Sequence, residues 1–139
     1  MKIGQFALNL VVAFISFGVL HALGTIFIYG GALQSMSEYM RAADDPQQQW
    51  IMVGHLLQTA AMVYLWLRGF ATNDLRCGAV FGMVYGTIIA ATDMVWWSSI
   101  KLPVDGMVAS IVSVVIIGGL VGMILAKLYD DGRDETLKE

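Results

Sequence analysis

Charged residues are scarce in this sequence: they make up 14% of its 139 residues, against about 25% in an ordinary soluble domain. A soluble domain of this size leaves a large part of its surface in water. Such a domain could not bury all the apolar surface of a chain that is 58% hydrophobic. The composition therefore predicts an integral membrane protein, in which lipid solvates much of the surface.

Cysteine and clustered basic residues are also scarce. The single cysteine, Cys77, excludes an intrachain disulfide and a cysteine-based metal site, and we interpret it as a small packing residue. The net charge is -3 and no run is rich in Lys or Arg. Nothing in the charge pattern therefore supports a nucleic-acid partner.

Four apolar stretches reach the ~20 residues that a helix needs to cross the hydrocarbon core of a membrane. They cover approximately residues 6–30, 46–70, 75–98 and 104–129. Backbone groups in lipid must be paired within each segment, so each stretch is expected to be a helix. The last three stretches are joined by short connections, which favour antiparallel neighbours. The sequence predicts an all-α fold: one transmembrane domain forming a four-helix bundle with up-down topology.

Residues typical of helix ends flank these stretches. Asp45 and Pro46 resemble an N-cap followed by proline at the first helical position. Asp74 offers a cap for the third stretch, and Pro103 is placed to open the fourth. The first stretch exceeds the ~7–15 apolar residues of a signal peptide, so we interpret it as a retained helix.

The basic residues near the helix ends predict the orientation of the bundle. If the N-terminus is cytoplasmic, Arg41 and Lys101 are the two basic residues on the far side. Six lie on the cytoplasmic side: Lys2, Arg68, Arg76, Lys127, Arg133 and Lys138. This bias predicts that both termini are cytoplasmic.

The segment 31–45 is the longest connection, and it carries Leu33, Met36, Met40 and Ala43 at roughly helical spacing. We expect a short amphipathic helix lying on the far membrane interface. The tail 130–139 is too polar to pack and is expected to be solvated.

Small residues recur every fourth position in the last two stretches. The third carries Gly78, Gly82 and Gly86, and the fourth carries Gly118 and Gly122. Stacked glycines form a flat surface that lets a second helix approach closely. We therefore expect these two helices to pack on each other, or one of them to pack on another subunit.

Three ionisable residues lie inside otherwise apolar spans: His21, His55 and Asp93. At about 1.5 Å per residue, His21 lies about 13 Å from the far surface, and His55 and Asp93 about 7 Å from it. Gln58 follows His55 on the same helix face. Such residues are costly in a membrane and usually functional, so the sequence predicts a polar centre in the far leaflet.

Three roles fit this centre. A neutral histidine can donate to Asp93 or Gln58 and fix the helix register. A His–Asp pair can instead handle a ligand or a proton near neutral pH. The third role is ligation of a metal ion or haem, for which His21, His55 and Asp93 are the candidates. There is no phosphate-binding loop and no nucleophile motif in the sequence, so no catalytic residue is assigned.

The run from Gly78 to Gly86, GAVFGMVYG, is followed by Asp93 and then by the fourth apolar span. In this segment, in length and in helix number, the chain resembles small four-helix bacterial inner-membrane proteins whose families have no known function. The resemblance implies a bacterial inner membrane and a four-helix fold, and it implies no activity.

The leading hypothesis is a non-enzymatic polytopic membrane protein that binds a partner subunit or a small apolar ligand in or beside its bundle. The alternatives are a small oligomeric transporter or channel subunit, and a haem- or metal-binding redox protein that uses His21 and His55. The expected partners are the lipid bilayer and further subunits, either copies of the same chain or those of a larger membrane complex.

Overall fold

The computed structural model describes residues 3–34, 36–42, 44–99, 101 and 103–129. The described residues form four helices that are long and apolar enough to cross a membrane, at Ile3–Ala32, Pro46–Phe70, Leu75–Ser98 and Val104–Leu128. This confirms an all-α fold with four apolar helices. The first helix is a few residues longer at each end than the predicted stretch 6–30. The predicted tail 130–139 and Ala43 lie outside the described residues.

Two of the four long helices contain a π-helical turn. The first consists of α1 (Ile3–Gly24), the π-helical turn η1 (Thr25–Tyr29) and α2 (Gly30–Gln34). The second begins with one 3-10 turn, continues as α3 (Gln49–Leu65) and ends in the π-helical turn η4 (Trp66–Phe70). The third and fourth are the uninterrupted helices α4 (Leu75–Ser98) and α5 (Val104–Leu128).

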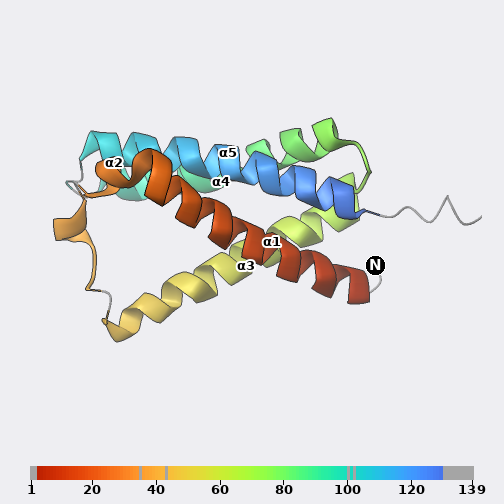
Figure 1. Ribbon diagram of the computed structural model, residues 1–139, viewed down its shortest axis with the longest axis horizontal. Helices are drawn as coiled ribbons and strands as arrows, with labels where there is room; N and C mark the ends of the chain where they lie inside the picture. Colours follow the sequence, from red (N-terminus) through yellow and green to blue (C-terminus); the bar gives the residue numbers. More distant parts are fainter. Residues whose placement is uncertain (1–2, 35, 43, 100, 102, 130–139) are drawn as a thin grey trace, which may run out of the picture.

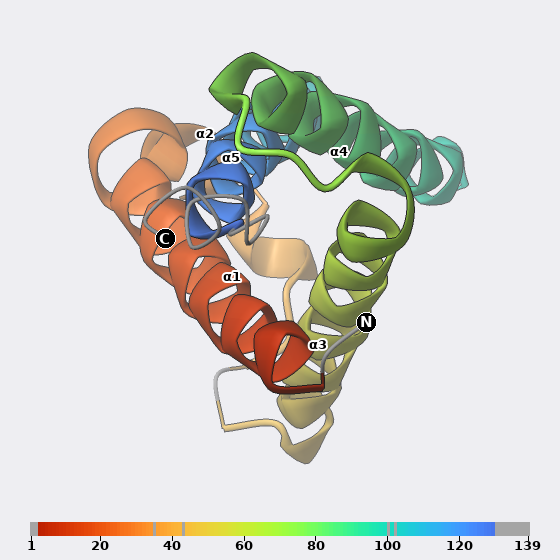
Figure 2. The ribbon, with the colours of Figure 1, turned by 90° about the vertical axis from the view of Figure 1, so that its right-hand side faces the viewer.

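The four helices run roughly along the long axis of the molecule, and α1 crosses α3 (Figure 1). The α4–α5 pair makes the most extensive contact, and α1 packs against both α5 and α3. Figure 2 shows α1 beside α5 on one side and α3 joined to α4 by the 71–74 loop on the other. We call the half that holds the start of α1 and the end of α5 the proximal half, and the half next to segment 31–45 the distal half.

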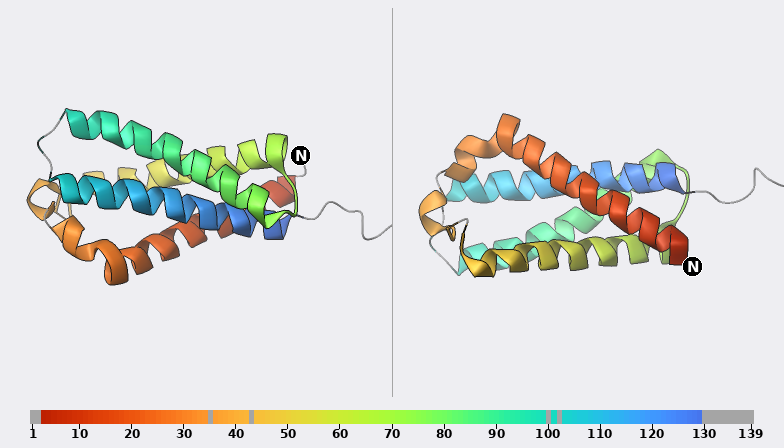
Figure 3. Two further views of the ribbon diagram at one scale, coloured as in Figure 1. Left: turned by 90° about the horizontal axis from the view of Figure 1, so that it is seen from above. Right: turned by 60° about the horizontal axis from the view of Figure 1, so that its bottom comes forward.

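The backbones of α4 and α5 touch at their glycines, and the two helices lie side by side (Figure 3). A Cβ atom added at Gly82 would collide with the carbonyl oxygen of Gly118, and one at Gly78 would collide with that of Gly122. At Gly86 it would lie 2.6 Å from the carbonyl oxygen of Val114. In lipid such close van der Waals contact is the main attraction between helices, so this pair forms the spine of the bundle.

The buried core lies in the proximal half. Trp66 is fully buried, and its ring lies 5.2 Å from that of Phe81, which in turn lies 5.1 Å from the ring of Phe70. The buried cluster combines residues from all four long helices: Ala13, Met62, Val63, Trp66, Phe81, Ile117, Val121, Leu125 and Ala126. Cys77 is partly buried against it. The distal half contributes little to this cluster.

One buried polar side chain in the proximal half was not singled out from the sequence. Asn9 of α1 is fully buried, and neither its amide oxygen nor its amide nitrogen has a hydrogen-bond partner among the described residues. The indole N–H of Trp66 is also buried without a partner there. Both groups lower the stability of the core, because a polar group away from water needs a hydrogen bond to offset its desolvation.

Segment 31–45 does not form the single amphipathic helix expected from its spacing. Within its described part, α2 ends at Gln34 and is followed by one 3-10 turn, η2 (Ser37–Tyr39). Met36 is buried, and its side chain occupies the space that a Cβ at Gly106 would take. The segment is therefore held back over the start of α5 and does not extend as a separate helix.

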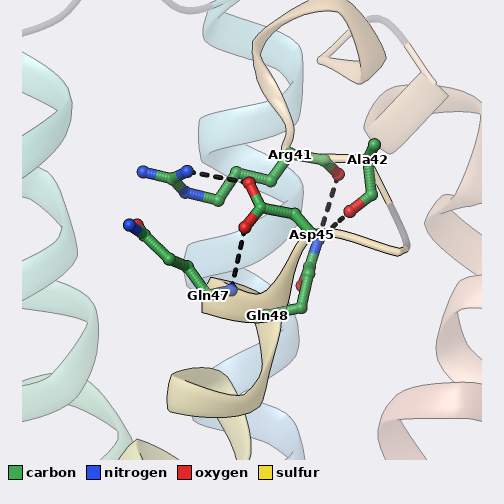
Figure 4. Close-up of polar contacts among 5 residues, drawn as sticks. All are labelled: Arg41, Ala42, Asp45, Gln47 and Gln48. Carbon is green, nitrogen blue, oxygen red and sulfur yellow. Dashed lines mark hydrogen bonds and ion pairs between the residues drawn. The ribbon is translucent and has the colours of Figure 1, made fainter.

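A hydrogen-bonded turn connects this segment to α3 (Figure 4). The Asp45 carboxylate accepts from the backbone N–H of Gln47 at 2.8 Å and from Arg41 Nη1 at 2.9 Å. The side chain of Gln48 donates to the carbonyl oxygen of Arg41 at 3.0 Å. These hydrogen bonds lower the pKa of Asp45 below its usual value, and the Gln47 N–H contributes more to this shift than the Arg41 guanidinium. The sequence correctly predicted Asp45 as this N-cap, and Asp74 caps α4 in the same way.

Candidate functional site

His21 lies on α1 just before the π-helical turn η1, and its side chain contacts Tyr29. The Tyr29 hydroxyl lies 3.0 Å from His21 Nδ1 and donates to the His21 carbonyl oxygen at 3.0 Å. The Thr25 hydroxyl donates to the same carbonyl at 2.9 Å. Because a tyrosine hydroxyl carries one proton, this arrangement requires Nδ1 of His21 to carry its own proton and donate to Tyr29. Nδ1 and the carbonyl oxygen of His21 are thus paired within its own helix.

Two glycines make room for this contact. A Cβ at Gly24 would lie 2.5 Å from the Tyr29 ring, so a larger residue there would push the ring away from His21. A Cβ at Gly30 would collide with the carbonyl oxygen of Thr25. The wider π-helical turn places the Tyr29 side chain against that of His21. Single π-helical turns of this kind are frequent at functional sites.

His55 on α3 and Asp93 on α4 lie in the distal half. No hydrogen bond or ion pair among the described residues joins His55 to His21 or to Asp93. The side chains of His55, Gln58 and Asp93 have no hydrogen bond to any described residue, and His55 and Gln58 are exposed. The structure therefore gathers the three ionisable residues in one region without joining them.

The direct contacts considered from the sequence are absent from the described part of the chain. His21 pairs with Tyr29, not with Asp93 or Gln58. The carbonyl oxygen of Gln58 accepts from the Tyr85 hydroxyl at 2.6 Å, which links α3 to α4. No three His, Cys, Asp or Glu side chains among the described residues lie close enough to share a metal ion.

An apolar groove lies between the first long helix and α5, with a volume of about 880 Å³. One wall is a ridge of every fourth residue on α5, and the other consists of side chains from α1, η1 and α2. Asp105 and Ser113 are the polar residues of this otherwise apolar or small lining: Leu20, Leu23, Gly24, Phe27, Ile28, Tyr29, Ala32, Val104, Asp105, Val108, Ala109, Val112, Ser113, Ile116, Ile117 and Leu120.

The groove is long enough for one lipid tail. Its α5 wall runs from Val104 to Leu120, which is about 24 Å at 1.5 Å per residue. One leaflet contributes about 15 Å of the hydrocarbon core. The spacing of Val104, Val108, Val112, Ile116 and Leu120 was present in the sequence, but periodicity alone does not distinguish a groove wall from an ordinary lipid-facing ridge.

Two separate features thus stand out: the apolar groove beside α5, and the polar side chains of α3 and α4 in the distal half. Neither contains the nucleophile, base and anion-stabilising set that acyl or phosphoryl transfer requires. Comparisons of the chain with protein-family models, curated proteins and solved structures find no significant match.

Proposed function

We propose that this chain is a multi-pass protein of the bacterial inner membrane that binds one apolar chain, an acyl or isoprenyl tail, in the groove beside α5. In this proposal it is not an enzyme, and both of its termini are cytoplasmic. The four long apolar helices support the membrane location, and the excess of basic residues near the proximal helix ends supports the orientation.

The groove is the observation that carries the proposal. Its volume of about 880 Å³ falls within the range of ~300–1,000 Å³ that is usual for sites of small ligands. Its walls are apolar along almost their whole length, which disfavours a polar ligand because burial would strip its hydration without replacing it.

The shape of the groove suits an extended tail. Its lining follows α5 from Val104 to Leu120, and an α-helix with its side chains is about 10–12 Å wide. An extended tail is narrower and lies along the Val112 ridge, opposite the side chains of the first long helix. A tail that enters laterally from the bilayer exchanges contact with other lipid tails for contact with protein, so good shape complementarity determines its affinity.

Filling the groove is expected to remove the bound tail. Val112 is a groove residue with 50% of its surface exposed, and Val112→Trp places an indole where the tail would lie. The displaced part of the tail returns to lipid and not to water, so what is lost is its packing against α5, and the tail is expected to leave the groove. The protein is reconstituted in nanodiscs containing a phospholipid with a photoactivatable acyl chain, and labelled positions are mapped by mass spectrometry.

Val84→Trp is the matched control, because Val84 is 56% exposed on α4 and is absent from the groove lining. The wild type and Val84→Trp are expected to show labels concentrated on residues that line the groove. Val112→Trp is expected to lose most of this labelling. Labels spread evenly over all lipid-facing residues of the wild type, or equal labelling of the two variants, would contradict tail binding in the groove.

A further inference from the structure

The distal part of α3 is poorly covered by the other described residues. Every residue from Trp50 to Gln58 is exposed except Gly54, which is partly exposed, so no face of this stretch is buried. The next two turns are different, because Thr59, Met62, Val63 and Trp66 are buried. In Figure 1 the start of α3 lies at the lower left, well away from the distal ends of α4 and α5 at the upper left.

This uncovered stretch carries polar side chains that lipid tails cannot satisfy. His55 and Gln58 on α3, and Asp93 on α4, have no hydrogen bond to the described residues. Ionisable side chains at this depth normally face protein or a water-filled cavity and pair with one another. The face between α3 and α4 is therefore incomplete in a single chain.

We propose that this face, made by His55, Gln58 and Asp93, is an interface with a second copy of the chain. In the dimer, His55 of each copy pairs with Asp93 of the other. The face supplies both a donor and an acceptor, which is what a two-fold interface needs, since each pairing then occurs twice.

The depth of the two residues fits this symmetry. A two-fold axis along the membrane normal leaves the depth of every atom unchanged, so a residue can pair only with a partner at its own depth. His55 lies five residues from Trp50 near the distal start of α3, and Asp93 lies five residues from Ser98 at the distal end of α4. Both therefore lie about 7 Å deep at about 1.5 Å per residue. The interface is separate from the α5 groove, and the dimer does not depend on tail binding.

Cysteine cross-linking between two differently tagged chains tests the pairing. Both chains carry Cys77→Ala, one carries His55→Cys and the other carries Asp93→Cys, and they are co-expressed in a bacterial membrane and oxidised. A disulfide that joins the two tags requires two molecules. The control pair is Leu57→Cys with Val95→Cys. Leu57 and Val95 are 66% and 69% exposed, and each lies two residues, or about 200° around its helix, from His55 and Asp93 respectively.

The expected result is a cross-linked heterodimer from the His55/Asp93 pair and none from the control pair. No heterodimer from the first pair, with both chains present in the membrane, or equal yields from both pairs, would overturn the proposal. Photobleaching counts of the unmodified chain in dilute vesicles provide a second measurement. The wild type is expected to be dimeric and Asp93→Asn to associate roughly tenfold more weakly. A wild type that remains monomeric at every lipid dilution also overturns it.

Discussion

Replacing Gly82 with alanine is expected to destabilise the protein by about 2–3 kcal/mol, although the change adds a single methyl group. The added Cβ would collide with the carbonyl oxygen of Gly118. The same Cβ would lie only 3.0 Å from the Cα of Gly119. Backbone atoms cannot move aside as a flexible side chain can, so α4 and α5 must separate. Contacts along the whole glycine surface weaken together, because they share one inter-helix distance.

The free energy of unfolding in micelles, measured by titration with a denaturing detergent, checks this prediction. Gly54→Ala is the matched control, because Gly54 is also a helical glycine and nothing lies within 4 Å of its added Cβ. That control is expected to be neutral or to gain up to about 1 kcal/mol from helix propensity. If both substitutions had the same effect, the close α4–α5 contact would not be the spine of the bundle.

Truncating Trp66 is expected to have the largest effect of any substitution in the core. Trp66 is fully buried and packs on Phe81, so Trp66→Ala leaves a cavity and costs about 3–5 kcal/mol. Trp66→Phe keeps most of the ring contact and removes an indole N–H that has no partner among the described residues. Its cost is therefore expected to be much smaller, since loss of the unpaired donor offsets part of the lost volume.

The same unfolding titration measures both variants. Trp50→Ala serves as the control, because Trp50 is 64% exposed at the distal end of α3 and its truncation leaves no buried cavity. Its effect on the unfolding free energy is expected to stay within about 0.5 kcal/mol. A loss for Trp50→Ala equal to that for Trp66→Ala would contradict a core confined to the proximal half.

Much of the fold could be predicted from the sequence because long apolar stretches in lipid have few alternatives to a helix. The third stretch was predicted as 75–98, which matches the bounds of α4. The cap at Asp45 was also predictable, because it depends on neighbouring residues alone. Segment 31–45 was not, because its path depends on the contact of Met36 with Gly106, which is distant in sequence.

The candidate site was less predictable. The presence of His21, His55 and Asp93 in one region follows from counting residues along the helices, but whether they meet depends on the separation of α3 from α4, which no periodicity reveals. The π-helical turn that brings Tyr29 to His21 shifts the side chains away from regular α-helical spacing. Asn9 could not be predicted as a buried polar residue, because a single neutral amide in an apolar stretch gives no sequence signal of which side it faces.

Four membrane crossings with both termini inside are the premise of every proposal above, and cysteine accessibility tests them most directly. In a chain with Cys77→Ala, Glu38→Cys and Asn73→Cys are made singly, since both positions are exposed in loops at opposite ends of the bundle. A membrane-impermeant maleimide is applied to spheroplasts before and after permeabilisation. We predict that Glu38→Cys is labelled in intact spheroplasts and that Asn73→Cys is labelled only after permeabilisation. Labelling of Asn73→Cys in intact spheroplasts, or protection of Glu38→Cys, would contradict this arrangement.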